Sequence, residues 1–355
     1  MRPPDCKTCS SAINEALVEA MALDETVICY GLGVADPKAI FGTTTGLKER
    51  FGDKRVFDMP TSENAMTGVA TGAALGGLKP VMTHQRLDFF LLALDQLVNA
   101  AAKWHYMFGS QQSVPITIRL IVGRGWGQGP THSQNLHSWF AHIPGLKVVM
   151  PTTPRDAKGL LLSSIFDPNP VVFIEHRWLH GGLGEVPDGD FRVPIGTANV
   201  LRSGSDITIA SSSYLTVEAL KAAKVLSQQY GIEAEILDLR TIRPLDWEAV
   251  LLSVARTGMF LALDTGFTTG SVAGEMVARV SMELFSQLKR PPSRLAMPDV
   301  AEPTSVALTH GFYVRSEHIV ERVAQMFGRP VVISEEPNCH DQMRDVPGEW
   351  FTGPF

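Results

Sequence analysis

Helical and strand-like patterns alternate along most of this chain, and that alternation restricts the folds open to it. Apolar residues recur at helical spacing between residues 12 and 21, a short apolar run follows at 26–30, and the alternation continues to about residue 326. Helices that alternate with buried strands build layered α/β folds around mostly parallel sheets. We therefore expect an α/β protein whose main domain is a doubly wound, mostly parallel sheet with helices on both faces.

The alternation is interrupted once, over residues 181–194, which are rich in Gly, Pro and Asp and lack apolar periodicity. Such a stretch is typical of a linker. We predict a first domain over 1–185, a smaller α/β C-terminal domain over 186–335 and an extended tail over 336–355. The expected strands lie at 26–30, 81–83, 114–122, 147–150, 171–175, 207–210, 234–237 and 259–263. One expected helix begins near Glu63, and others span 88–107, 216–229, 272–288 and 317–326.

Composition argues against several classes of protein. The net charge is −6 and the basic residues are scattered, so no electrostatic footprint for nucleic acid or anionic lipid is present. No apolar run approaches the roughly 18 residues of a membrane span, and the first residues lack the apolar core of a signal peptide, so we expect a soluble cytoplasmic enzyme. The Cys6-x-x-Cys9 pair has no second ligand pair at zinc spacing, and we interpret it as incidental.

A stripe of glycines marks the predicted helix that follows Glu63. Gly68, Gly72 and Gly76 are four residues apart and therefore share one face of that helix, where a second helix can approach closely. The contact is either within the domain or between subunits. We expect two such helices to meet across the axis of a β2 dimer.

Three segments stand at probable strand-to-helix junctions, where open α/β sheets build their sites. They span 59–65, 84–90 and 123–134. Taken alone, each has a plain structural explanation. Glu63 is a first-turn carboxylate favoured by the helix dipole, Phe89 is a core residue, and His132 follows a glycine-rich loop whose backbone can approach a ligand.

Together, these segments resemble the beta subunit of 2-oxo acid dehydrogenase decarboxylase components of the pyruvate, branched-chain and acetoin types, in the transketolase-like superfamily. The resemblance covers the chain to about residue 330, with matching segments in the same order at 62–65, 95–99, 132–134, 140–149, 156–160 and 238–241. It implies dependence on thiamine diphosphate, a pyrimidine-binding first domain and a transketolase-like C-terminal domain.

The resemblance also implies roles for individual residues. Glu63 matches the glutamate that hydrogen-bonds the aminopyrimidine ring of the cofactor and promotes loss of the thiazolium proton. Phe89 matches the aromatic residue that packs on that ring, and Gln85 joins it among the expected cofactor contacts. His132 matches the histidine on the substrate side of the thiazolium. A monovalent cation such as K⁺ is expected at Ile116, Ser164, Ile165, Asp167 and Asn169.

One motif of the wider superfamily is missing. The chain has no Gly-Asp-Gly followed at the usual distance by Asn, the pattern that holds the diphosphate through magnesium. We therefore expect an alpha-type subunit to hold Mg²⁺ and the diphosphate. The expected assembly is an α2β2 heterotetramer with the cofactor at the α–β interface, and a lipoyl acyltransferase is a further expected partner.

The chain also departs from the dehydrogenases. Leu32 follows Gly31 where the family usually has an acidic residue, so a proton relay near the cofactor is expected to differ. The approach to the site is polar and cationic, through His84, Gln85, Arg86, Arg124 and Trp126. Because arginine suits the recognition of carboxylate or phosphate, we expect His84, Arg86 and Arg124 to contact substrate. Surface arginines or intersubunit salt bridges explain the two arginines equally well.

These departures leave a second enzymatic hypothesis open. A transketolase-like carboligase would pass its activated aldehyde to a carbonyl or sugar acceptor instead of to lipoamide. A regulatory protein without chemistry is disfavoured because Glu63, Phe89 and His132 occur together. The preferred hypothesis is an oxidoreductase subunit acting in 2-oxo acid decarboxylation. A lipoyl acyltransferase encoded beside the gene would favour that hypothesis over the carboligase.

Overall fold

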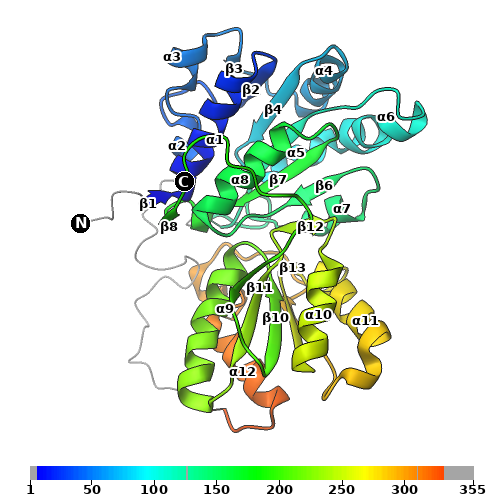
Figure 1. Cartoon of the computed structure of the whole chain (residues 1–355). Helices are drawn as coiled ribbons and strands as arrows, with labels where there is room; N and C mark the ends of the chain where they lie inside the picture. The colour runs from blue at the N-terminus through cyan, green and yellow to red at the C-terminus, as the bar shows by residue number, and fades with distance from the viewer. Residues whose placement is uncertain (1–5, 125–126, 310, 332–355) are drawn as a thin grey trace.

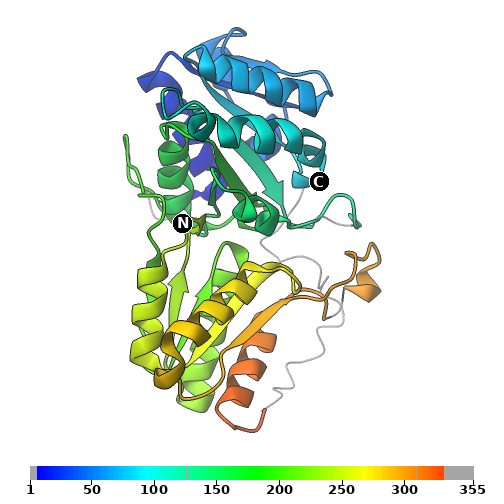
Figure 2. The same ribbon diagram turned by 90° about the vertical axis from the view of Figure 1, so that its right-hand side faces the viewer.

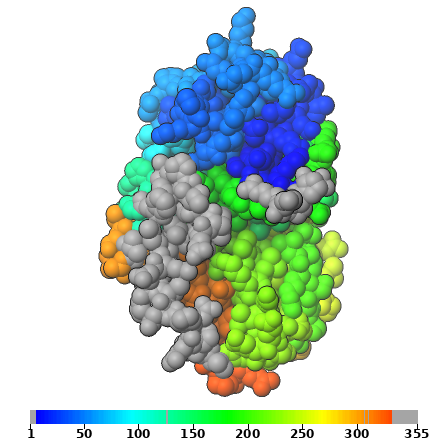
Figure 3. All heavy atoms as spheres, turned by 90° about the vertical axis from the view of Figure 1, so that its left-hand side faces the viewer, coloured from blue at the N-terminus to red at the C-terminus, as the bar shows by residue number. Residues whose placement is uncertain are grey.

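The computed structural model describes residues 6–124, 127–309 and 311–331, which form two stacked halves, each built on its own sheet (Figure 1). Trp126 and the tail over 336–355 lie outside the described residues. The space-filling view shows the two halves in contact, with the N-terminal segments above and the segments from about residue 200 onward below (Figure 3).

The upper half contains a seven-stranded sheet in the order β12-β6-β7-β5-β4-β2-β3. Its strands are β2 (Val27–Gly31), β3 (Val56–Asp58), β4 (Lys79–His84), β5 (Thr117–Val122), β6 (Lys147–Val149), β7 (Val171–His176) and β12 (Thr241–Arg243). All neighbouring strands pair in parallel except β12, which comes from the second half of the chain and pairs antiparallel with β6. Every residue of β5 and β7 is buried, which explains their continuous apolar runs.

Helices cover both faces of this sheet. On one face lie α1 (Cys9–Leu23) and α8 (Pro154–Ile165), which share a core with alternate strand residues such as Val81 and Phe173. The other face is covered by α4 (Glu63–Leu75), α5 (Leu87–Phe90), α6 (Ala102–Met107) and α7 (His137–His142). Two short helices, α2 (Ala39–Gly42) and α3 (Leu47–Phe51), follow β2. The arrangement confirms the predicted doubly wound α/β class.

The lower half has a five-stranded sheet in the order β14-β13-β10-β11-β9 (Figure 2). Its strands are β9 (Asn199–Arg202), β10 (Ile207–Ser211), β11 (Ala234–Asp238), β13 (Phe260–Phe267) and β14 (Ser293–Met297), and only β9 is antiparallel to its neighbour. Helices α9 (Tyr214–Val225) and α12 (Ser316–Met326) pack on one face, and α10 (Trp247–Thr257) and α11 (Val272–Leu284) pack on the other.

Two details of the predicted secondary structure are wrong. The single helix expected over 88–107 is instead α5, a 3-10 turn over Leu91–Ala93, a π-helical segment over Gln96–Ala101 and α6. Within it, Asn99 Nδ2 donates to Asp95 Oδ1 at 2.7 Å. Uneven windings of this kind are not visible in apolar spacing, and π-helical turns often accompany functional sites.

The stretch interpreted as a linker contains a strand. Residues Leu183–Glu185 form β8, which pairs antiparallel with β1 (Cys6–Thr8). Both strands are exposed or half-buried, so neither carries the apolar alternation that would have revealed it. The domain boundary near residue 185 remains a prediction.

Three further observations on the described residues concern membrane spans, the Cys6 and Cys9 thiols, and metal-binding groups. No helix among them is long and apolar enough to cross a membrane. Cys6 and Cys9 are both free, and burial raises the pKa of the Cys9 thiol far above its ordinary value. No group of three or more His, Cys, Asp or Glu side chains in the described ranges is arranged to hold a metal ion.

Candidate functional site

Glu63 is the first residue of α4, directly after the Pro-Thr-Ser turn that follows β3. Its side chain is only 6% exposed. The start of a helix is a favourable place for a carboxylate because the unpaired N–H groups there carry partial positive charge. Glu63 is therefore a nearly buried carboxylate at a strand-to-helix junction.

The second segment leaves the sheet beside the first. Gly31 at the end of β2 pairs with Thr83 of β4 on one side and with Asp58 of β3 on the other, so the carboxyl ends of the three strands share one edge. A Cβ added to Gly31 would lie 2.1 Å from the Thr83 carbonyl oxygen, which requires glycine at that position. Gln85 reaches toward the same loop, since its Nε2 lies 2.8 Å from the Cβ position of Gly33.

His132 is exposed and meets the second segment through its ring. Its imidazole lies edge-on to Phe89, with ring centroids 5.4 Å apart. The Thr131 hydroxyl lies 2.9 Å from His132 Nδ1. Two residues after His132 in the sequence, Gln134 Nε2 donates to Asp88 Oδ1 at 2.8 Å. The structure thus brings together two residues predicted for one site, although their roles remain predictions.

The two arginines expected at the pocket edge are buried, so their interpretation as surface residues is wrong. Arg86 donates to the Gly123 carbonyl at 2.8 Å and to Gln128 Oε1 at 2.6 Å. Arg124 donates to the carbonyl oxygens of Pro303 and Thr304 in the lower half. Arg86 therefore binds the glycine-rich loop that precedes His132, and Arg124, a residue of that loop, connects it to the lower half. Whether they also contact substrate remains a prediction.

His84 lies at the end of β4 and is 2% exposed. Burial lowers its pKa to about 3, so its imidazole is neutral at physiological pH. Its Nε2 has no hydrogen-bond partner among the residues that the structure describes. A neutral buried ring nitrogen can donate or accept one hydrogen bond, which suits a ligand contact but does not identify the ligand.

A connection between the two halves was missed at the sequence level. Asn135 Nδ2 donates to Thr265 Oγ1 at 2.5 Å, and His137 Nε2 lies 3.0 Å from Asp264 Oδ1, with both members of this pair buried. Burial opposes ionisation of Asp264, but His137 and the backbone N–H groups of residues 266 and 273 outweigh it and hold its pKa below the ordinary value. These residues are distant in sequence, and no local motif signals their contact.

The residues named for a monovalent cation meet where α8 ends and β7 begins. The Ile116 carbonyl accepts from Val171 N at 3.0 Å, and the Ser164 carbonyl accepts from Asp167 N at 3.3 Å. The Asp167 carboxylate accepts from Asn169 N at 2.9 Å and pairs with the Lys147 ammonium. Each carbonyl oxygen keeps a second lone pair for a cation. The bound ion itself stays a prediction.

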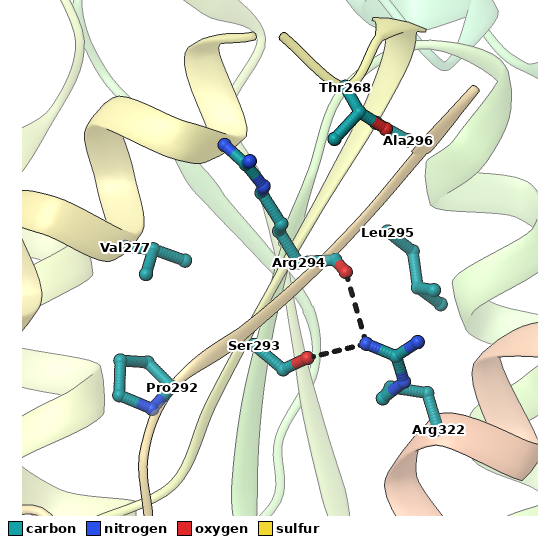
Figure 4. Close-up of a pocket in the computed structure, with 8 residues that line it drawn as sticks. All are labelled: Thr268, Val277, Pro292, Ser293, Arg294, Leu295, Ala296 and Arg322. Carbon is teal, nitrogen blue, oxygen red and sulfur yellow. Dashed lines mark hydrogen bonds between the residues drawn. The ribbon is translucent and has the colours of Figure 1, made fainter. Parts of the chain in front are cut away.

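A pocket of about 610 Å³ lies in the lower half, along the edge strand β14 (Figure 4). It is therefore away from the carboxyl ends of β2, β3 and β4. It is lined by Thr268, Val277, Pro292, Ser293, Arg294, Leu295, Ala296 and Arg322. Arg322 extends from α12 toward β14 and donates to Ser293 Oγ at 2.9 Å and to the Arg294 carbonyl at 3.4 Å (Figure 4). None of the residues expected in the active site lines it, so pocket size does not locate the chemistry here.

Comparison with known proteins defines the class first. Residues 7–181 match the transketolase pyrimidine-binding domain, and residues 196–319 match the transketolase C-terminal domain. A split-gene transketolase described as an inactive beta4 tetramer has a TM-score of 0.73 at 22% identity, over 90% of this chain and 98% of its own. A transketolase mutant from Pichia stipitis has a TM-score of 0.64 at 17% identity, over 92% of this chain and 47% of its own. The fold is that of the transketolase-like proteins.

Curated relatives then narrow the class. The acetoin:2,6-dichlorophenolindophenol oxidoreductase subunit beta of Cupriavidus necator is 41% identical over 84% of this chain and 90% of its own. That of Bacillus subtilis is 38% identical over 91% and 98%, and the pyruvate dehydrogenase E1 component subunit beta of Rhizobium meliloti is 42% identical over 85% and 65%. The chain belongs to the family of E1 beta subunits, the thiamine-diphosphate-dependent oxidoreductase components that pair with an alpha subunit.

Proposed function

We propose that this chain supplies the pyrimidine-binding half of a thiamine diphosphate site in a 2-oxo acid decarboxylating oxidoreductase. The observation that carries the proposal is the Glu63 carboxylate at the start of α4, which is only 6% exposed and follows β3 at the carboxyl end of the sheet. A carboxylate in that state fits the protonated ring nitrogen of an aminopyrimidine, because a buried acceptor gains most from a strong donor.

When bound, thiamine diphosphate supplies the carbon nucleophile and the electron sink for decarboxylation. Glu63 would share a proton with the pyrimidine ring nitrogen and so raise the basicity of the neighbouring amino group. Phe89 would pack against the same ring and fix its position. His132 would lie on the substrate side, where its imidazole would donate to the 2-oxo acid carboxylate or move the proton of the product. The Phe89–His132 ring contact supports placing both residues in one site.

The assembly we propose is an α2β2 heterotetramer in which the alpha subunit holds Mg²⁺ and the diphosphate. The sequence supports this division because it lacks the Gly-Asp-Gly…Asn pattern for that task. We further propose a cytoplasmic location, a K⁺ ion near Ile116 and Asp167, and delivery of the acyl product to a lipoyl acyltransferase. The carboligase hypothesis is weaker because the transketolases resemble this chain only at 17–22% identity, whereas the E1 beta relatives reach about 40%.

The activity of Glu63→Gln tests the proposal. The chain is reconstituted with an alpha-type subunit from the same organism, and reduction of 2,6-dichlorophenolindophenol is measured with pyruvate, other 2-oxo acids and acetoin. Loss of proton transfer through Glu63 should lower kcat by roughly 10²–10⁴-fold. Glu49→Gln is the matched control, because Glu49 is an exposed first-turn glutamate in α3. An unchanged kcat in Glu63→Gln would contradict the assignment, provided that thermal unfolding shows both variants to be folded.

A further inference from the structure

The segment that carries His132 is attached to the lower half of the molecule on both sides of that residue. Before it in the sequence, Arg124 donates to the carbonyl oxygens of Pro303 and Thr304. After it, the side chain of Asn135 donates to a residue of β13. The lower half therefore contributes to the placement of a histidine that belongs to the upper half.

Asn135 is the centre of the second attachment. Its side chain is buried, and its Nδ2 donates to Thr265 Oγ1 at 2.5 Å. On its other side, Asn135 Oδ1 lies 2.8 Å from His137 Nδ1, and His137 Nε2 lies 3.0 Å from Asp264 Oδ1. Two consecutive residues of β13 thus contact two residues of the segment that follows His132, and three of these four side chains are buried.

The end of β13 is itself firmly held. The Asp264 carboxylate accepts from the backbone N–H of Gly266 at 2.7 Å and from that of Ala273, near the start of α11, at 3.1 Å. A Cβ added to Gly266 would lie only 3.1 Å from the carbonyl oxygen of Asn135 and 3.2 Å from Cε1 of His137. The segment after His132 is therefore packed closely against a strand end that has little freedom to move.

On its other face, the same segment contacts the residues beside the expected cofactor position. Gln134 Nε2 donates to Asp88 Oδ1 at 2.8 Å, and the neighbouring Phe89 meets the ring of His132 with the centroids 5.4 Å apart. Only two residues separate His132 from Asn135. A displacement of Asn135 would consequently move the backbone that presents the imidazole.

We propose that Asn135 and Thr265 are positioning residues for His132, and that the hydrogen bond between them lets the lower half fix the imidazole beside Phe89. A buried amide that loses its partner is costly, so the segment would shift to recover one if the Thr265 hydroxyl were removed. The inference rests on the role proposed for His132. It gives a residue of the lower half a function in the active site, exerted through the backbone of residues 132–135.

Thr265→Val tests the inference in the reconstituted enzyme, because it removes the hydroxyl with little change in shape. A misplaced His132 should lower kcat/KM for the 2-oxo acid by roughly 10–10²-fold, whereas the affinity for thiamine diphosphate should stay as in wild type. Thr265→Ser keeps the hydroxyl and should restore activity. Thr268→Val is the matched control, since the Thr268 hydroxyl donates to the Met297 carbonyl at 2.8 Å and does not contact the segment.

A double-mutant cycle shows whether Thr265 acts through His132. In a His132→Ala background, Thr265→Val should cause no further loss of kcat/KM, because the group that it positions is already absent. Losses that multiply would mean that the two residues act independently, and the inference would be wrong. Thermal unfolding of each variant checks that it is folded.

Hydrogen–deuterium exchange of the peptide over residues 127–136, followed by mass spectrometry of the reconstituted enzyme, gives a test that does not depend on activity. Thr265→Val should speed exchange in this peptide, and Thr265→Ser and Thr268→Val should not. Unchanged exchange in Thr265→Val would overturn the inference. Full activity in His132→Ala would instead refute the proposed role of His132, while the exchange rates would still report on the contact between Asn135 and Thr265.

Discussion

The glycine stripe on α4 predicts that one substitution, Gly72→Ala, will stabilise the isolated chain and weaken its self-association. Within the chain, Gly68 faces Gln96, whose Oε1 lies 3.3 Å from the Cβ position, whereas a Cβ added to Gly72 meets no atom within 4 Å. Gly72→Ala therefore adds only helix propensity, and the free energy of unfolding of the isolated chain should rise by about 0.8–1 kcal/mol. If α4 meets a second α4 in a β2 dimer, the added methyl group obstructs that contact and self-association weakens.

Urea unfolding of the chain at low concentration measures the first effect, and sedimentation equilibrium measures the second. Ala73→Gly, one residue further along α4, is the matched control and should destabilise the isolated chain by a similar amount. A less stable Gly72→Ala chain would refute the reasoning about open space around Gly72. A stabilised variant that self-associates as wild type does would show that this face of α4 is not the dimer contact.

Three further substitutions have definite expected outcomes. Asp264→Asn replaces a buried carboxylate that contacts His137 and accepts two backbone N–H groups, and it should lower the urea unfolding free energy by about 1–3 kcal/mol; an unchanged free energy would contradict these buried contacts. Burial and Asp156 raise the pKa of Asp238 from 3.8 to about 7, so stability falls with rising pH between those values, and Asp238→Asn should flatten that fall in thermal scans. Gly145→Ala places a Cβ 1.9 Å from the Ala102 carbonyl oxygen, at a residue whose φ is +96°, so the variant should have a much lower Tm. An unchanged Tm would contradict this prediction.

Much of the central architecture could be predicted from sequence because parallel strands buried on both faces are continuous apolar runs. Strands β4, β5, β7, β10 and β11 fall within a few residues of their predicted positions. Strand β5 starts at Thr117 and not at residue 114 because Pro115 has no N–H for a ladder. The pair β1–β8 and the edge strands β9 and β14 were missed because their residues are partly exposed and carry no apolar run.

The candidate site could be predicted only in part. Glu63, Phe89 and His132 lie within or beside recognisable local segments. The structure confirms the predicted helix start near Glu63 and places the rings of Phe89 and His132 with their centroids 5.4 Å apart. Arg124 was expected to contact substrate at the pocket edge, with a surface position as the alternative, yet it is buried and its partners include carbonyls from a distant part of the chain.

The most direct test of the central claim is a calorimetric titration of Mg²⁺ and thiamine diphosphate into the purified chain, first alone and then mixed with an alpha-type subunit from the same organism. The account predicts no binding to the chain alone and stoichiometric binding to the mixture, because this chain supplies only the pyrimidine half of the site. Tight binding to the chain alone would reveal a diphosphate site within it and would contradict the division of the cofactor site between two subunits.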